Sequence, residues 1–376
     1  MSPSGVREEA SDSNPLQATS SADAQQAEIQ QLLRRCLGVQ ATSIQKIEAG
    51  IGSRRFYRLT LETAQGLPPT LIARVEAPED PALRPAGVPP EPSLEPLRSF
   101  LEAEGFPVPA SFGRDPNAGI ELLEDAGVES LETAALRLEP DARRQLYAQA
   151  CALVPRLQRL DAEPGRIPAF GRHLDSALFT YKAEQFIEWC LPWGLARSPN
   201  RAEAEAVRGA FSLVAEECAA APSRLSHRDF KAANLLLPPG SPAERPLLMI
   251  DIQGAFLAPP EYDLVCLLRD AHVVLPEDEV ERHLREVRPA LPDAPEPGQF
   301  ARRFTLLTLT RNGKDLARYL YAARRRGDER YLRLLPNAVA ALRRAAAAAA
   351  GWDARLMRLA ELIEQLPREE EAACAR

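Results

Sequence analysis

The stretch LSHRDFKAANLLLPPGSPAERPLLMIDIQGAFLAPPEYDLVCLLRD, residues 225–270, decides the fold, because it sets a fixed order of polar groups among short apolar runs. His227-Arg228-Asp229 precedes Lys231 and Asn234, and Asp251 follows seventeen residues after Asn234. A phosphoryl-transfer site of the kinase type requires an aspartate that orients an acceptor hydroxyl, then an asparagine and a second aspartate that hold Mg²⁺. We therefore predict Asp229 as the catalytic residue with Lys231 beside it, and Asn234 and Asp251 as metal ligands.

The apolar runs at 235–237 and 247–250, separated by a Pro/Gly/Ser-rich turn, predict a β-hairpin. The hairpin would bring Asn234, at the start of its first strand, beside Asp251, at the end of its second. The alternative is a solvated loop made of ordinary turn residues. His227 and Asp263 are assigned structural roles, and Asp263 is expected to cap a helix over 263–274 and to brace the catalytic loop through its backbone.

Composition limits the function classes. The chain has 376 residues, of which 45% are hydrophobic, enough for two cored domains. Its net charge of −7, from 46 basic and 53 acidic residues, argues against a general binder of nucleic acid or of membrane surfaces. The six cysteines show no metal-ligand spacing, and no segment reads as a signal peptide or a membrane span, which favours a cytoplasmic protein with reduced, mostly buried thiols.

The first third of the chain predicts a β-rich nucleotide-binding domain. Residues 1–22 read as a disordered tail, 23–37 as a helix, and 43–48, 54–61 and 69–76 as strands. Gly50, Gly52 and Ser53 lie between two of these strands and are candidates to cover nucleotide phosphates, although an ordinary hairpin turn would look the same. Arg55, one of three arginines in five residues, is a second phosphate candidate, with a solvated strand face as the alternative.

Two further groups are predicted to contact nucleotide. Arg74 is the only basic residue on the third strand, where a kinase carries the cation that grips the α- and β-phosphates. Glu95, at the start of a helix over 95–105, could pair with it, and Glu91 and Glu102 compete for that role. The strand that ends in Glu124 and Gly127 fits a hinge between two lobes whose backbone binds adenine, with a plain connection as the alternative.

From residue 128 the sequence changes to helical patterns. A long helix over 304–322 is expected to be interrupted at Asn312-Gly313, because glycine inside a helix costs about 1 kcal/mol relative to alanine. Arg269, Arg311, Asn312 and Lys314 are candidates for the acceptor pocket. The predicted organisation is a tail at 1–22, an N-lobe at 23–127, a C-lobe at 128–366 and a charged tail at 367–376.

Six segments carry a resemblance to a known family: SRRFYRL, GFPVP, ELLEDAG, HRDFKAANLLL, IDIQGAFLAPPEYDLVCLLRD and TRNGKDLARYL. Over roughly residues 25–366 the chain resembles the aminoglycoside phosphotransferase/choline kinase superfamily, and within it the bacterial anomeric kinases of N-acetylmuramate and N-acetylglucosamine in cell-wall recycling. The resemblance implies an α+β bilobal protein-kinase-like fold with a small β-rich N-lobe and a large helical C-lobe. It also implies ATP, Mg²⁺, Asp229 as the catalytic aspartate, and Asn234 with Asp251 as metal ligands.

The expected activity is transfer of the γ-phosphoryl group of ATP to a sugar hydroxyl. One alternative is an aminoglycoside or choline type of acceptor, which would favour clustered acidic groups, whereas a carboxylate-bearing sugar would favour the arginines and lysine named above. The other alternative is a nucleotide-binding pseudokinase, against which the intact Asp229, Asn234 and Asp251 argue. The expected partner is a small-molecule sugar, with no nucleic acid or membrane, and the chain is expected to be a monomer or weak dimer.

Overall fold

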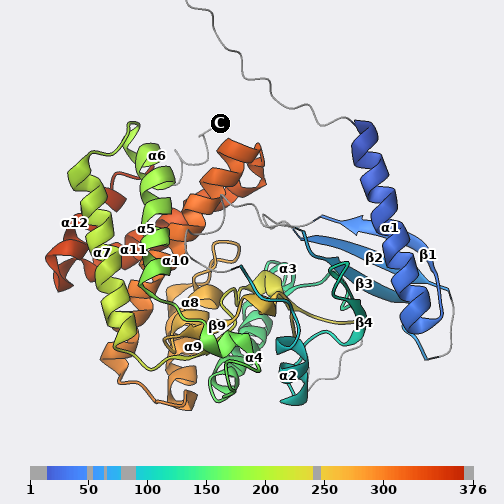
Figure 1. Cartoon of the computed structure of the whole chain (residues 1–376). Helices are drawn as coiled ribbons and strands as arrows, with labels where there is room; N and C mark the ends of the chain where they lie inside the picture. Colours follow the sequence, from blue (N-terminus) through green and yellow to red (C-terminus); the bar gives the residue numbers. More distant parts are fainter. Residues whose placement is uncertain (1–14, 49–53, 63–65, 78–89, 240–246, 368–376) are drawn as a thin grey trace, which may run out of the picture. The chain divides into compact units, whose positions relative to one another are not determined.

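A five-stranded antiparallel sheet, in the order β1-β2-β3-β5-β4, forms the core of the smaller of two units in the computed structural model (Figure 1). The structure describes residues 15–48, 54–62, 66–77, 90–239 and 247–367. The strands are β1 Ala41–Ile47, β2 Arg55–Leu61, β3 Thr70–Val75, β4 Ser111–Asp115 and β5 Ile120–Glu124. Four of the five were predicted. The sequence did not indicate β4, because SFGRD has one apolar residue and no fully buried position.

Helix α1 (Pro15–Leu37) packs on this sheet through an apolar core. Ile29, Leu32 and Leu33 are buried against β-strand residues, as the helical periodicity predicted. Cys36, near the end of the same helix, is exposed, unlike the mostly buried cysteines that the sequence predicts. The helix begins at Pro15 rather than at residue 23, and residues 1–14 lie outside the described residues.

Helices make up most of the larger unit, which joins residues 81–109 to 126–376. They are α2 Leu97–Ala103, α3 Leu131–Ala135, α4 Pro140–Leu157, α5 Ser176–Gln185, α6 Leu191–Leu195, α7 Arg201–Ala219, α8 Tyr262–Leu268, α9 Glu277–Val287, α10 Pro297–Arg326, α11 Leu335–Ala349 and α12 Ala354–Ile363. Two small antiparallel pairs lie among them: β6 (Arg224–Ser226) with β9 (Phe256–Ala258), and β7 (Leu235–Leu236) with β8 (Leu248–Met249). The predicted α+β class, β-rich first and helical afterwards, is confirmed.

Residues 90–109 belong to the larger unit, although the sequence grouped them with the strands. The reason lies in their hydrogen bonds. The backbone N–H of Met249 donates to the carbonyl oxygen of Pro107 at 2.8 Å. Arg228 pairs with Glu91 at 2.5 Å. Both partners lie on the segments around the predicted catalytic loop, so this stretch is tied to that loop.

Helix α10 is continuous over 30 residues, so the interruption expected at Asn312-Gly313 is absent. The glycine serves close packing instead of a kink. A Cβ on Gly313 would lie 3.1 Å from the ring of Phe186, which belongs to the π-helical turn Phe186–Cys190 after α5. Helix α8 is also shorter than predicted, because it ends at Leu268.

Two general features complete the fold. Among the described helices, none combines the length and the apolar character that crossing a membrane would need. The five cysteines in the described ranges are free, and all but Cys36 are buried. Cys374 lies outside those ranges.

Candidate active site

The predicted catalytic loop begins where β6 ends and is held by one buried carboxylate. Asp263, in the first turn of α8, accepts hydrogen bonds from the backbone N–H groups of His227 at 2.7 Å and of Arg228 at 3.1 Å. Burial raises the pKa of Asp263 to about 6, against the opposing effect of His227 and of these N–H groups. The predicted bracing role of Asp263 is therefore seen, whereas the helix cap is not, because Glu261 occupies that position.

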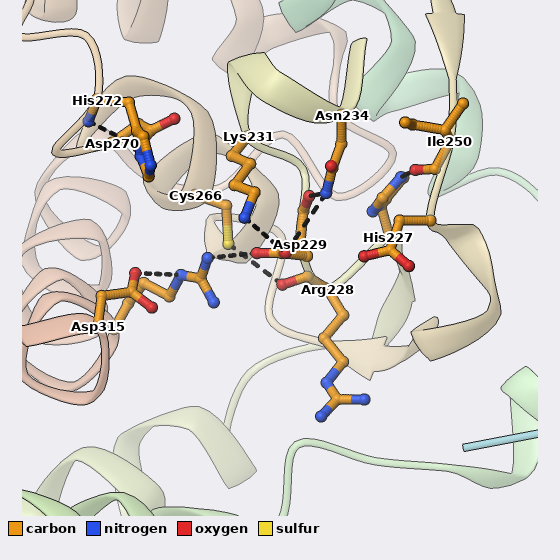
Figure 2. Close-up of polar contacts among 12 residues, drawn as sticks. His227, Arg228, Asp229, Lys231, Asn234, Ile250, Cys266, Asp270, His272 and Asp315 are labelled. Carbon is orange, nitrogen blue, oxygen red and sulfur yellow. Dashed lines mark hydrogen bonds and ion pairs between the residues drawn. The ribbon is translucent and has the colours of Figure 1, made fainter. Parts of the chain in front are cut away.

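His227 secures the other side of the loop. It is 3% exposed, and its Nε2 donates to the carbonyl oxygen of Ile250 at 3.0 Å (Figure 2). That carbonyl directly precedes Asp251, one of the two predicted metal ligands. The imidazole thus ties the start of the predicted catalytic loop to the residue that follows β8, which agrees with the structural role expected of it.

The carboxylate of Asp229 is the centre of a charged cluster (Figure 2). Its Oδ1 accepts from Nη2 of Arg311 at 2.6 Å, and its Oδ2 lies 3.3 Å from the ammonium of Lys231. Burial alone would raise the pKa of Asp229, but Lys231, Arg311 and Lys314 hold it well below its usual range. In turn, Asp229 raises the pKa of Lys231 to about 12. Both groups therefore stay charged over the physiological pH range.

The predicted hairpin is present and brings Asn234 beside the end of β8. Strands β7 and β8 pair in antiparallel register, and the backbone N–H of Ile250 donates to the carbonyl oxygen of Asn234 at 3.0 Å. The Asn234 amide nitrogen donates to the Asp229 carbonyl oxygen at 2.8 Å and lies 3.4 Å from Asp229 Oδ2. This orientation leaves the amide oxygen as the group that faces other partners. Part of the connecting turn, 240–246, lies outside the described residues.

Asp251 follows β8 with backbone angles in the left-handed region, φ 62° and ψ 37°. This conformation is disfavoured for a residue with a Cβ and is concentrated at functional sites. The side chain is exposed, and its Oδ1 accepts from the amide of Gln253 at 2.5 Å. No group of three or more His, Cys, Asp or Glu side chains suited to a metal ion occurs among the described residues. One carboxylate and one amide oxygen nevertheless fit Mg²⁺, which binds to few protein oxygens and keeps waters and phosphate oxygens as further ligands.

The predicted acceptor residues take different partners. Arg269 forms a bidentate ion pair with Glu277, at 2.7 and 2.8 Å. The amide nitrogen of Asn312 donates to the Arg269 carbonyl oxygen at 2.8 Å. Lys314 pairs with Asp315 at 2.6 Å, and burial, followed by the nearby Arg311, lowers the pKa of Lys314 to about 8. Arg311 alone among these candidates reaches Asp229, and the assignment of the other three to an acceptor pocket stays a prediction.

The predicted nucleotide residues are spread over both units. Gly50, Gly52 and Ser53 lie outside the described residues. Arg55 is exposed and donates to Gln25 at 3.1 Å. Arg74 is buried and donates to Glu121 on β5 at 2.8 Å and to Glu76, which directly follows β3, at 2.6 Å.

Glu95 takes its own partners as well, Arg98 at 2.5 Å and the backbone N–H of Ser99 at 3.1 Å. The carboxylate of Glu124 accepts the Ala110 N–H at 3.1 Å. Gly127 has φ +86°, a value that favours glycine. Each of these contacts lies within one unit, and the nucleotide roles stay predictions.

Two acidic residues near the loop were missed by the sequence reasoning. Asp315 contacts both Arg311, at 3.1 Å, and Lys314. Its spacing of four residues from Arg311 on a helix was the available signal. Asp270 is the second: its Oδ1 accepts from Nδ1 of His272 at 2.7 Å, and its buried Oδ2 has no hydrogen-bond partner among the described side chains. No spacing in the sequence indicated this pair.

Comparison with known families agrees with this geometry. The model of the phosphotransferase enzyme family matches residues 43–297. The chain belongs to this family, and it is an enzyme that transfers a phosphoryl group to a hydroxyl group. The resemblance stated from the sequence motifs is confirmed.

Three relatives carry the same name, N-acetylmuramate/N-acetylglucosamine kinase. The Pseudomonas putida protein is 26% identical over 286 residues, which cover 74% of this chain and 79% of the relative. The Pseudomonas aeruginosa protein is 26% identical over 73% of this chain and 78% of its own length. The Caulobacter vibrioides protein is 30% identical over 48% of this chain and 50% of its own length.

Solved structures confirm the kinase-like fold. A choline kinase from Streptococcus pneumoniae matches with a TM-score of 0.56 at 14% identity, over 87% of this chain and 99% of that one. An aminoglycoside phosphotransferase bound to ADP matches with a TM-score of 0.54 at 14% identity, over 85% of this chain and 97% of that one. At this level of identity the likeness concerns the fold alone.

Proposed function

We propose that the protein is a cytoplasmic, ATP-dependent kinase that phosphorylates the anomeric hydroxyl of an N-acetylated amino sugar, N-acetylmuramate or N-acetylglucosamine, released by cell-wall turnover. The observation that carries the acceptor is the shared name of relatives that this chain matches over about three quarters of its length. The observation that supports the reaction is the cluster of Asp229, Lys231 and Asn234 on one braced loop.

In the proposed reaction the loop residues position the acceptor hydroxyl and neutralise negative charge on the transferring phosphoryl group. The acceptor oxygen bonds to the γ-phosphorus of ATP, the bond from that phosphorus to the β–γ bridging oxygen breaks, and ADP leaves. Asp229 holds the acceptor hydroxyl in line and receives its proton as the new bond forms. The ammonium of Lys231, 3.3 Å from the Asp229 carboxylate, would neutralise charge on the transferring group.

Asn234 and Asp251 would hold Mg²⁺. The bound ion would supply charge neutralisation on the phosphate oxygens of the nucleotide. The chain's own part is to present oxygens: the amide of Asn234 is turned by its hydrogen bonds to Asp229, and the carboxylate of Asp251 is presented from a left-handed backbone position.

The direct test is ³¹P NMR of the protein with ATP and Mg²⁺, and with N-acetylmuramate, N-acetylglucosamine, choline or kanamycin in separate samples. A sugar-1-phosphate signal with either amino sugar is the expected result. Phosphorylated choline or kanamycin, with no sugar phosphate, would retain the kinase reaction and refute the amino-sugar acceptor. No product in any sample would refute the proposed function as a whole.

Two variants test the assigned roles. Asp229→Asn is expected to lower kcat by about 10³-fold or more while nucleotide affinity stays unchanged, because it removes the group that orients the hydroxyl. Asp328→Asn, at a surface carboxylate that pairs with Arg330, is the matched control. Asp251→Asn is expected to weaken Mn²⁺ binding in the presence of ADP, as followed by electron paramagnetic resonance. Unchanged Mn²⁺ affinity would remove Asp251 from the metal site.

A further inference from the structure

Arg311 joins two carboxylates that are far apart in the sequence. It lies on α10, and its side chain is 8% exposed. Its Nη2 donates to Asp229 Oδ1 at 2.6 Å, and its Nε lies 3.1 Å from Oδ2 of Asp315, one helical turn further along α10. The planar guanidinium therefore connects the catalytic loop with the longest helix of the larger unit.

We propose that Arg311 is a positioning residue for phosphoryl transfer, which fixes the rotation of the Asp229 carboxylate so that one oxygen is presented to the acceptor hydroxyl. This inference rests on the proposed role of Asp229. It differs from the interpretation of the sequence, in which Arg311 contacts the acceptor itself.

The distances identify Arg311 as the dominant restraint on this carboxylate. An aspartate side chain can rotate about its last bond, and that torsion has a broad energy minimum. Lys231 at 3.3 Å and the amide of Asn234 at 3.4 Å both face Oδ2, and both contacts are long for hydrogen bonds. The Arg311 contact at 2.6 Å is a short, charge-assisted hydrogen bond to the other oxygen. Loss of Arg311 would therefore leave only weak contacts to define the rotation.

Arg311 is itself held in place by its neighbours on α10. The Nε of Arg311 forms an ion pair with Oδ2 of Asp315 at 3.1 Å, and Lys314 pairs with the other oxygen of Asp315 at 2.6 Å. Asn312 is hydrogen-bonded to the Arg269 carbonyl oxygen, and Gly313 packs closely against Phe186. A side chain that is restrained in this way can hold a catalytic group within the small tolerance that positioning requires.

The inference predicts a specific kinetic pattern with the acceptor found by NMR. Arg311→Met is expected to lower kcat by about 100-fold, since a misplaced catalytic group commonly has an effect of that size, with the KM for the acceptor and the affinity for nucleotide nearly unchanged. Arg311→Lys should recover part of kcat, because an ammonium can reach one of the two carboxylates. Asp315→Asn should lower kcat by a smaller factor, because it loosens the restraint on Arg311.

Controls separate positioning from folding. Arg302→Met removes another arginine of α10, whose partner Glu217 lies at the surface, and should leave kcat unchanged. Added guanidinium ion should restore part of kcat in Arg311→Ala, whereas Asp229→Asn should not respond. A purely structural role would not produce this rescue.

Three results would overturn the inference. A kcat within about twofold of wild type in Arg311→Met would show that Asp229 needs no such restraint, given that twofold is under 0.5 kcal/mol. A raised acceptor KM with unchanged kcat would make Arg311 a binding residue. Full turnover in Asp229→Asn would remove the proposed role of Asp229 and the inference with it. If the wild-type protein forms no product, the proposed function itself is refuted. If it forms product and Arg311→Met keeps its kcat, only the role of Arg311 is refuted.

Discussion

Helices α10 and α5 each bury a cation, and the two cations have opposite surroundings. Arg311 on α10 contacts Asp229 and Asp315; burial alone would lower its pKa, but these carboxylates raise it above the usual range. Lys182 on α5 is 5% exposed, and its ammonium has no hydrogen-bond partner among the described residues. Burial, with Lys314 and Arg311 nearby, lowers its pKa to about 7. Burial thus favours the neutral form of Lys182, whereas the carboxylates of Asp229 and Asp315 keep the buried Arg311 charged.

The aromatic rings around Lys182 are its remaining partners. Its Nζ lies 5.0 Å from the ring centroid of Phe179 and 5.2 Å from that of Tyr262. Cation–π contacts of this kind contribute about 1–2 kcal/mol when desolvated, less than the several kcal/mol needed to bury an ammonium. We therefore expect opposite effects on the free energy of unfolding: removing a paired arginine of α10 should lower it, whereas removing the unpaired lysine of α5 should raise it.

The largest expected effect on stability concerns a second paired cation of α10. Arg303 makes three hydrogen bonds of 2.8 to 3.1 Å to Glu261, which is fully buried. Arg303→Met would leave that carboxylate uncompensated and is expected to lower the free energy of unfolding by about 3–5 kcal/mol in urea titrations. The double variant with Glu261→Met should recover a substantial part of this loss. If Arg303→Met were as stable as wild type, the expected difference between paired and unpaired buried cations would be refuted.

Lys182→Met should act in the other direction. Methionine has a similar length and no charge, so the substitution removes an unpaired ammonium and keeps the apolar contacts. We expect the free energy of unfolding at neutral pH to rise by about 1–4 kcal/mol. Lys182→Ala is the informative comparison: it also creates a cavity, so it should raise the free energy of unfolding by less than Lys182→Met. Destabilisation by Lys182→Met would show that the contacts to Phe179 and Tyr262 outweigh desolvation.

The pH dependence of stability sharpens the same point. The pKa of Lys182 in the folded protein, about 7, lies below its usual 10.5, so the unfolded chain binds more protons between these values. Stability from this group therefore rises with pH from about 7 to 10.5, by up to ~1.4 kcal/mol per pH unit. Around the ammonium, Lys314 and Arg311 lower the pKa, while Cys266 and Cys218 raise it. Urea titrations of wild type and Lys182→Met across this window should converge as pH rises; parallel curves would refute the assignment.

The smallest expected effect concerns Arg269, whose partner Glu277 is 46% exposed. An ion pair of this kind contributes about 0–1 kcal/mol, so Arg269→Gln should scarcely change the free energy of unfolding. The variant also tests the acceptor prediction, because a raised KM for a carboxylate-bearing sugar, with unchanged KM for N-acetylglucosamine, would place Arg269 in the pocket. Glu277→Gln is the control, since it removes the same ion pair and leaves the guanidinium.

The sequence was sufficient wherever the chemistry is local. The two apolar runs around the turn predicted the hairpin, because a hairpin is set by neighbouring residues, whereas the catalytic role of Asp229 stays a prediction. The bracing by Asp263 also followed from the motif. The helix cap expected of the same residue did not form, since its carboxylate is occupied by the two N–H groups of the loop.

Tertiary contacts could not be derived in the same way. Arg311 and Asp229 are separated by 82 residues, and no local pattern relates them. Gly313 was interpreted as a break, because the helix propensity of glycine is low, but packing against Phe186 outweighs that propensity. No local pattern in the sequence marks Lys182, and only the packed structure shows that it is buried without a hydrogen bond among the described residues.

The unbroken course of α10 limits how the chain can vary in length. Arg303 and Arg311 are eight residues apart on one helix, and each must meet a carboxylate outside it. Inserting one residue between them would turn everything beyond it by about 100° and advance it by about 1.5 Å, so both pairs could not form together. Substitutions on the outer face of this segment should be tolerated, whereas a gain or loss of a single residue should not. Among related sequences, we therefore expect the number of residues between these two arginines to vary less than the identity of those residues.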